Sequence, residues 1–232
     1  MSNEKGRITM MKEMGPTWRF YILFVLVGAA CSKNPADSST AAKVQAPTPT
    51  TQQSKAPKGD WKTVELTGDI IFVGSKVTGN HVCKFNDWKG EANLSTVGSS
   101  YDFSSAAISF TLNTKGVVVD FKDPKPWSKK LERHLRSADF FDSDQYPTAT
   151  FVSSRIVAKQ GNNSTHEITG NLTIKGISKS ITFPVNLSQA HGKIKASAEF
   201  SINRRDFNIV YDGKPDDLVR DDVLLRFALD GK

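Results

Sequence analysis

From residue 60 to its end, the chain alternates apolar and polar residues with a period of two. The clearest runs cover residues 106–112, 168–174, 181–187, 194–202 and 223–229. Successive side chains of a β-strand point to opposite faces, so each run predicts a strand with one apolar face and one face in water. The pattern indicates that residues 60–232 form one all-β domain.

Short breaks that contain glycine separate the alternating runs. Gly-Asn-Asn at 161–163, Lys-Gly at 175–176 and His-Gly at 191–192 are typical of hairpin turns. The one helical candidate covers residues 127–138, with Ser128 as its N-cap. Together these features predict an antiparallel meander with one short helix between two strands.

An open antiparallel sheet of this length would expose both of its edges and leave its apolar face uncovered. Closing the sheet into a barrel removes the edges. A barrel of about eight strands has an interior that side chains fill or that holds one small ligand. The alternation by itself is compatible with a two-sheet sandwich as well as with a barrel.

The first thirty residues have the composition of a secretory signal. An apolar run over residues 18–30 ends in Gly-Ala-Ala, and the segment carries the basic residues Lys5, Arg7, Lys12 and Arg19. The run is shorter than the ~20 apolar residues that a membrane-spanning helix requires. We therefore expect a cleaved signal peptide over residues 1–30, with a retained membrane anchor as the alternative.

Cys31 directly follows the apolar run, and residues 26–30 before it resemble a bacterial lipobox, after which a cysteine receives diacylglycerol. Gly28 departs from that pattern, which prefers an aliphatic residue there, and the small residues also suit ordinary signal peptidase. We expect Cys31 to be the lipid anchor of a lipoprotein. Ser32 is typical of sorting to the outer membrane, so the expected location is its periplasmic face, or the soluble periplasm without lipidation.

Residues 31–59 are rich in Ser, Thr, Ala, Pro, Gln and Lys and contain no aromatic residue. Such a segment buries too little apolar surface to offset its ordering entropy, so we expect a disordered tether. As a flexible chain it would have a reach of ~30 Å and would lift the domain off a membrane.

The net charge of +7 is spread along the chain. The locally basic residues 122–136 are interrupted by Asp123 and Glu132, which favours a solvated helix face; attraction to anionic headgroups is the alternative. A nucleic-acid site would require a basic stripe with stacking aromatic residues, and none is evident. We expect no nucleic-acid partner.

Catalytic and metal-binding patterns are weak in this sequence. His81 and Cys83 are two residues apart and could share a strand face, but the histidines otherwise lack metal-ligand spacing. Cys83 is better explained as a small buried apolar residue. No Gly-x-Ser-x-Gly elbow or phosphate loop occurs. From these patterns we expect no enzymatic activity, metal or cofactor.

Several short motifs follow one another in a recognisable order across residues 60–232. They are Ile-Ile-Phe-Val-Gly-Ser at 70–75, Trp-Lys-Gly at 88–90, His-Leu-Arg-Ser-Ala-Asp-Phe-Phe-Asp at 134–142, Tyr-Pro at 146–147, Gly-Asn-Leu-Thr-Ile-Lys-Gly-Ile-Ser-Lys at 170–179 and Arg-Asp-Phe-Asn-Ile at 205–209. In order and spacing they resemble the YceI-like family. Lys175 and Asn208 depart from it, because His and Gly are common at those positions.

The resemblance implies an eight-stranded, lipocalin-like β-barrel that holds a long-chain lipid such as a polyisoprenoid. Some family members are dimers, so a homodimer is also expected. The implied function is binding an isoprenoid or fatty-chain lipid, including fatty amides and acids, as carrier or storage at the bacterial envelope. The alternative is an envelope-stress or protein-interaction module with a filled core and no ligand.

Inward-facing apolar residues are the candidate ligand contacts, although ordinary core packing explains each one equally well. They are Phe85, Trp88, Ile108, Phe110, Phe151, Leu172, Ile174, Phe183, Val185, Phe200, Phe207, Leu225 and Phe227. Arg136, Arg204 and Arg205 are candidates for a phosphate headgroup, since guanidinium groups bind phosphates well. For Arg204, exposure to solvent is the favoured expectation.

Overall fold

The computed structural model describes residues 33–49, 60–159 and 164–232. The predicted signal peptide, Cys31 and the turn expected at 161–163 lie outside these ranges, so they stay predictions. Within the described ranges, no helix is both long enough and apolar enough to span a bilayer.

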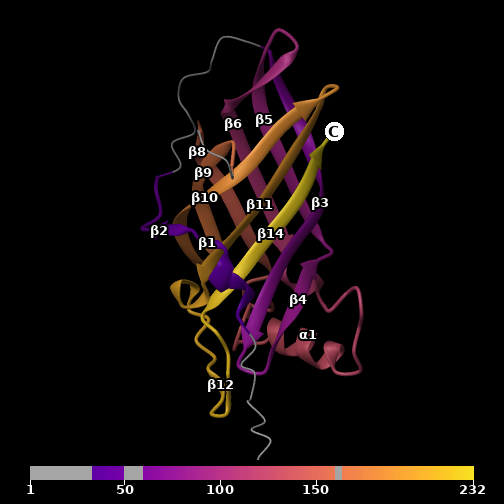
Figure 1. Cartoon of the computed structure of the whole chain (residues 1–232), viewed down its shortest axis with the longest axis vertical. Coiled ribbons are helices and arrows are strands. Elements are labelled where there is room, and N and C mark those ends of the chain that lie inside the picture. Colours follow the sequence, from indigo (N-terminus) through magenta and orange to yellow (C-terminus); the bar gives the residue numbers. More distant parts are fainter. Residues whose placement is uncertain (1–32, 50–59, 160–163) are drawn as a thin grey trace, which may run out of the picture. The chain divides into compact units, whose positions relative to one another are not determined.

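Eight antiparallel strands close into a barrel, as expected (Figure 1). Each strand pairs with the next, and the last pairs with the first through registers such as Leu225 opposite Phe72. The barrel strands are β3 (Trp61–Lys76), β5 (Trp88–Val97), β6 (Ser100–Asn113), β8 (Thr148–Ala158), β9 (His166–Ile174), β10 (Ile177–Ala190), β11 (Lys193–Asn203) and β14 (Asp222–Gly231). The predicted turns at 175–176 and 191–192 join β9 to β10 and β10 to β11.

Smaller elements cover one end of the barrel. β4 (Gly79–Phe85) pairs with the second half of β3 and with β7 (Val117–Val119). Two 3₁₀ turns, η2 (Thr114–Gly116) and η3 (Arg204–Phe207), follow β6 and β11. After η3, a loop holds the two-residue strands β12 (Gly213–Lys214) and β13 (Asp217–Leu218).

The one α-helix within the described ranges, α1 (Ser128–Arg136), lies between β7 and β8, where a helix was expected. The expected N-cap is wrong: Trp127 caps the helix without a side-chain bond, and Ser128 Oγ accepts a hydrogen bond from the Lys125 backbone at 2.9 Å. Glu132 is buried and accepts from the Val119 amide at 3.2 Å, which ties α1 to β7.

The expected disordered tether is wrong for residues 34–45, which we call the N-terminal strap. The strap contains η1 (Pro35–Ser38), β1 (Thr40–Ala41) and β2 (Lys43–Gln45). β1 pairs with β11 and β2 pairs with β10. The folded domain therefore begins well before residue 60.

The strap is ordered because it fills a split in the barrel wall. β10 and β11 pair directly only over residues 186–190 and 193–197, and beyond that point each has an open edge. The strap supplies main-chain partners to both edges, while Ala42 and Val44 pack on the barrel core. The expectation of disorder was based on the small number of apolar side chains in this segment, whereas the main-chain pairing with β10 and β11 does not depend on side chains.

Candidate ligand-binding cavity

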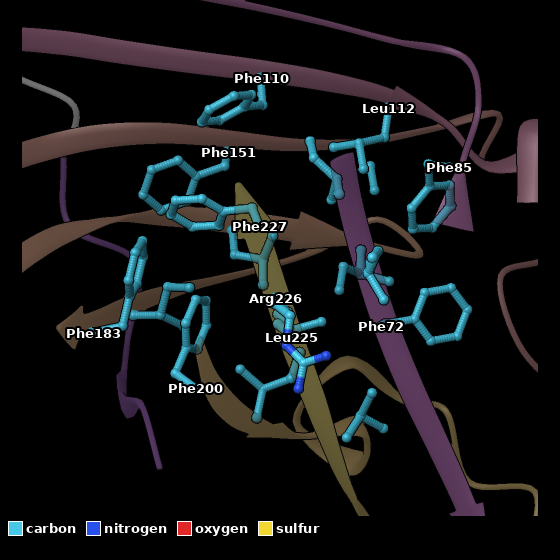
Figure 2. Close-up of a pocket in the computed structure, with 18 of the residues that line it drawn as sticks. Phe72, Phe85, Phe110, Leu112, Phe151, Phe183, Phe200, Leu225, Arg226 and Phe227 are labelled. Atoms are coloured by element: carbon cyan, nitrogen blue, oxygen red, sulfur yellow. The ribbon is translucent and has the colours of Figure 1, made fainter. Parts of the chain in front are cut away.

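The barrel encloses an apolar cavity of about 230 Å³ whose lining comes from all eight barrel strands (Figure 2). On β3 the lining extends from Leu66 to Gly74, which is ~27 Å along a strand at ~3.4 Å per residue. It also reaches Phe103 on β6 and Ile209 after η3. The cavity is therefore elongated along the strands.

Several inward-facing side chains are only partly buried because they face this cavity. Ile70, Ile108, Phe110, Leu225 and Phe227 are half-buried, although all five line the interior. In a filled core, neighbouring side chains would cover such residues almost completely. The interior is thus hollow and is not plugged by its own phenylalanines.

Two glycines explain why large aromatic rings leave the interior open. A Cβ atom placed on Gly90 would lie 2.5 Å from Cδ1 of Phe110, and one placed on Gly170 would collide with the Phe151 ring and lie 2.6 Å from the Val152 carbonyl oxygen. The Phe110 and Phe151 rings therefore lie against the barrel wall over positions that have no side chain. Any other residue at these glycines would push the rings inward.

Aromatic rings form two groups along the cavity, as Figure 2 shows. In the first group, Phe183 stacks on Phe200 with ring centroids 4.2 Å apart and lies 5.7 Å from Phe151 and 6.2 Å from Phe227. The second group contains Phe72, which lies 5.5 Å from Phe85 and 5.8 Å from Phe141. The aliphatic Leu112 and Leu225 lie between the two groups in this view.

The structure brings the predicted contact residues together, with one exception. All but Trp88 line the cavity: Phe85, Ile108, Phe110, Phe151, Leu172, Ile174, Phe183, Val185, Phe200, Phe207, Leu225 and Phe227. Trp88 packs against Phe110 instead, with ring centroids 6.0 Å apart. Whether the lining residues touch a ligand stays a prediction.

The sequence analysis missed the contribution of the first long strand and of the double phenylalanine after α1. Leu66, Ile70 and Phe72 of β3 line the cavity, as do Phe140 and Phe141. The alternation of Ile70, Phe72 and Gly74 was a usable signal for β3. The Phe-Phe pair lies in an irregular segment, where no sequence periodicity indicates whether a side chain points into the barrel or away from it.

Arg204 is buried rather than exposed, contrary to expectation. Its guanidinium donates to the carbonyls of Ile209 at 2.6 Å, Arg220 at 3.1 Å and Val219 at 3.3 Å, and it pairs with Asp221 at 2.9 Å. Burial lowers the pKa of Arg204, and Asp221 partly offsets this effect. Arg204 thus holds the loop after η3 against the barrel.

The other two candidate arginines also have protein partners. Arg205 forms ion pairs with Asp212 and Asp221, and Arg136 donates to the Val117 carbonyl at 3.1 Å. The positive groups in the cavity lining are Arg204, Arg220 and Arg226. Arg226 pairs with Glu199 on the outer face, so its charge is directed away from the interior.

Cys83 is a buried thiol, as expected. Burial raises its pKa, and the carboxylates of Asp120 and Glu132 add to this effect. His81 lies instead against the Trp127 ring, with centroids 4.9 Å apart. Among the described residues, no group of three or more His, Cys, Asp or Glu side chains could hold a metal ion.

The cavity lining offers little chemistry beyond apolar contact. In the described part of the chain, it includes no Ser, Thr, Cys, His, Asp, Glu, Lys or Tyr residue. A nucleophile or a general acid–base pair would have to come from such residues. The geometry suits the exclusion of water around an apolar ligand.

Comparisons with known proteins place these features in a family. Residues 34–230 match the YceI-like domain model. The UPF0312 protein of Pectobacterium atrosepticum is 32% identical over 153 residues, covering 63% of this chain and 71% of the relative. That of Pseudomonas putida is 34% identical over 105 residues, covering 43% of this chain and about half (54%) of the relative.

Two solved structures share the fold. BcnA of Burkholderia cenocepacia aligns with a TM-score of 0.58 and 26% identity, over 70% of this chain and 95% of BcnA. A polyisoprenoid binding domain from Saccharophagus degradans aligns with a TM-score of 0.52 and 14% identity, over 73% of this chain and 97% of that domain. With its closed barrel, its hollow apolar interior and a sequence match that begins in the strap, the chain belongs to the YceI-like family.

Proposed function

We propose that the barrel binds the apolar tail of a long-chain lipid, such as a polyisoprenoid or a fatty acid or amide, as a carrier or storage protein of the bacterial envelope. The observation that carries this proposal is the elongated cavity with its almost wholly apolar lining. A dry interior of this kind gains free energy only by enclosing an apolar chain, because it has few polar partners to offer.

The free energy expected from burying an apolar tail in the cavity is large enough for a lipid-binding protein. Each methylene group that leaves water contributes ~0.8 kcal/mol, so about ten of them would contribute ~8 kcal/mol. That is comparable with a Kd of ~1 μM before the costs of association are subtracted. Longer tails would bind more tightly until the cavity is full.

The family relationship supports the same class of ligand. The solved domain from Saccharophagus degradans is described as polyisoprenoid binding, and it shares the barrel fold. The particular lipid for this chain is part of the proposal. So is a homodimer, which rests on the family resemblance. Lipidation of Cys31 and the periplasmic face of the outer membrane as the location are also part of it, and they rest on the sequence patterns alone.

Native mass spectrometry of the purified protein before and after extraction with organic solvent, with identification of the extracted lipid, tests the binding function. We expect a mass increment that organic solvent removes and that identifies a long-chain lipid. Repeated recovery of empty protein that also fails to bind added prenyl and acyl lipids would refute the proposal and favour a protein-interaction module. For the anchor, Cys31→Ser should shift the protein from the membrane fraction to the soluble envelope fraction.

A further inference from the structure

One end of the barrel is built from α1, the β3–β4 turn at 77–78 and the loop at 209–221; we call it the α1 end. The Val77 amide donates to the Leu218 carbonyl at 3.1 Å, and Trp127 contacts His81 at the start of β4. Figure 1 shows α1, β4 and β12 near this end and the end of β14 near the other. These contacts make the α1 end one continuous surface.

The α1 end exposes large apolar side chains in a polar surrounding. Trp127 is 45% exposed, Val210 is 52% exposed and Leu218 is 48% exposed. A tryptophan beside aliphatic residues is typical of groups that enter the headgroup region of a bilayer.

Basic residues lie close in the chain to two of these apolar side chains, Trp127 and Leu218. Lys122, Lys130, Arg133 and Lys214 are exposed and have no carboxylate partner within the described ranges. Unpaired lysine and arginine side chains next to apolar ones favour a surface of anionic lipid headgroups, since each contributes an attraction that salt weakens.

The N-terminal strap begins at this same end. Asn34 Nδ2 donates to the carbonyl of Asp222, the first residue of β14, at 3.2 Å, and Ala36 packs against Val73 and Leu224. Asn34 lies three residue steps along the chain from Cys31, which limits their distance to ~11 Å. A lipid on Cys31 would thus hold the α1 end close to the bilayer, rather than ~30 Å away on a flexible tether.

The cavity extends to the α1 end as well. Its lining includes Phe140 after α1, and Ile209 and Val219 from the 209–221 loop. A bilayer against this end would lie beside the nearest part of the apolar interior. A lipid tail could then move between bilayer and barrel with little exposure to water.

We propose that the α1 end docks onto a bilayer surface that contains anionic lipids. Docking itself rests on the surface, and the position of the strap supports it if Cys31 is lipidated as proposed. The passage of a lipid tail rests in addition on the proposed function. Trp127, Val210 and Leu218 enter the headgroup region, and the unpaired basic residues contact the phosphates.

The test uses the chain from residue 31 onward, which forms one compact unit, with Cys31→Ser so that no lipid anchors it. We expect co-sedimentation with phosphatidylglycerol-containing vesicles and much weaker binding to pure phosphatidylcholine. Trp127→Ala with Leu218→Ser should weaken vesicle binding on the order of tenfold, as should Lys130→Glu with Lys214→Glu. Raising the salt from ~0.05 M to ~0.5 M should weaken it as well.

A matched control exists at the opposite end, where Trp61 is 45% exposed and Val97 is 70% exposed. Trp61→Ala with Val97→Ser should leave vesicle binding unchanged. Equal losses from the two apolar pairs, or binding that ignores both lipid charge and salt, would overturn the docking proposal. Docking and lipid binding can be judged separately. If every variant retains a lipid in the cavity, the proposed function holds even where vesicle binding fails.

Discussion

Replacing Gly90 with alanine should narrow the cavity without replacing any of the side chains that line it. The new methyl group would lie 2.5 Å from Cδ1 and 2.6 Å from Cε1 of Phe110, whereas carbon atoms prefer ~3.5–4.0 Å. The Phe110 ring must therefore move by ~1–1.5 Å. Phe110 lines the cavity and packs against Trp88 at a centroid distance of 6.0 Å, so we expect the ring to move into the open space of the cavity.

The displaced ring would take the room of about two or three methylene groups. At ~0.8 kcal/mol each, the loss of lipid binding is ~1.6–2.4 kcal/mol, or about 15-fold to 60-fold in Kd. The protein itself should lose ~1–3 kcal/mol of stability from overpacking. Titration with a fluorescent long-chain fatty acid measures the Kd, and urea denaturation measures the stability.

Two further variants make the Gly90→Ala result interpretable. Gly79→Ala adds the same methyl group where no atom lies within 4 Å, so it should bind lipid like the unmodified protein. Gly90→Ala with Phe110→Leu restores room and should recover most of the affinity. If Gly90→Ala binds every chain length as tightly as the unmodified protein while its fold is intact, the Phe110 ring does not limit the cavity.

Three other predictions concern the frame around the cavity. Arg204→Met leaves buried carbonyls without donors and should lower the free energy of unfolding, measured by urea denaturation, by ~3–5 kcal/mol. Arg205→Gln should lower it by ~1 kcal/mol or less. Similar losses for both variants would contradict the structural role of Arg204. Asn34→Ala removes a capping hydrogen bond and a hydrogen bond to β14, so it should lower the free energy of unfolding by ~0.5–2 kcal/mol. Amide hydrogen exchange in the strap should become faster. Unchanged exchange would show that the cap does not hold the strap. Burial raises the pKa of Cys83 above its ordinary value of 9.0, so the folded protein keeps a proton that the unfolded chain releases. The contribution of Cys83 to the free energy of unfolding is therefore fully present below pH 9.0. Above pH 9.0 it should fall by up to ~1.36 kcal/mol per pH unit, and Cys83→Ala should reduce this slope.

The barrel itself could be predicted because its strands repeat one simple pattern. Residues such as Ile168 and Phe183 alternate with polar neighbours, and the side-chain period of a strand translates this directly into an inner and an outer face. The resemblance to a family then decided between a barrel and a sandwich. Nearly all of the predicted inward residues consequently line the cavity.

The strap, the burial of Arg204 and the hollow interior depend on contacts between residues far apart in the sequence. A local sequence pattern does not predict such contacts. The strap holds Ala42 and Val44 against the core only because β10 and β11 separate and offer free edges. Arg204 is buried because three carbonyls of a later loop converge on it. The hollow depends on rings that lie over Gly90 and Gly170, positions whose importance becomes visible once the strands are in register.

The pairing of the strap also constrains the order in which the molecule can be completed. Thr40 pairs with Phe200, about 160 residues later in the chain, and such distant contacts form late because the intervening loop must close first. The N-terminal strap must therefore wait for β10 and β11 before it has partners. During that interval, their edges and the aromatic stack behind them are exposed to other chains.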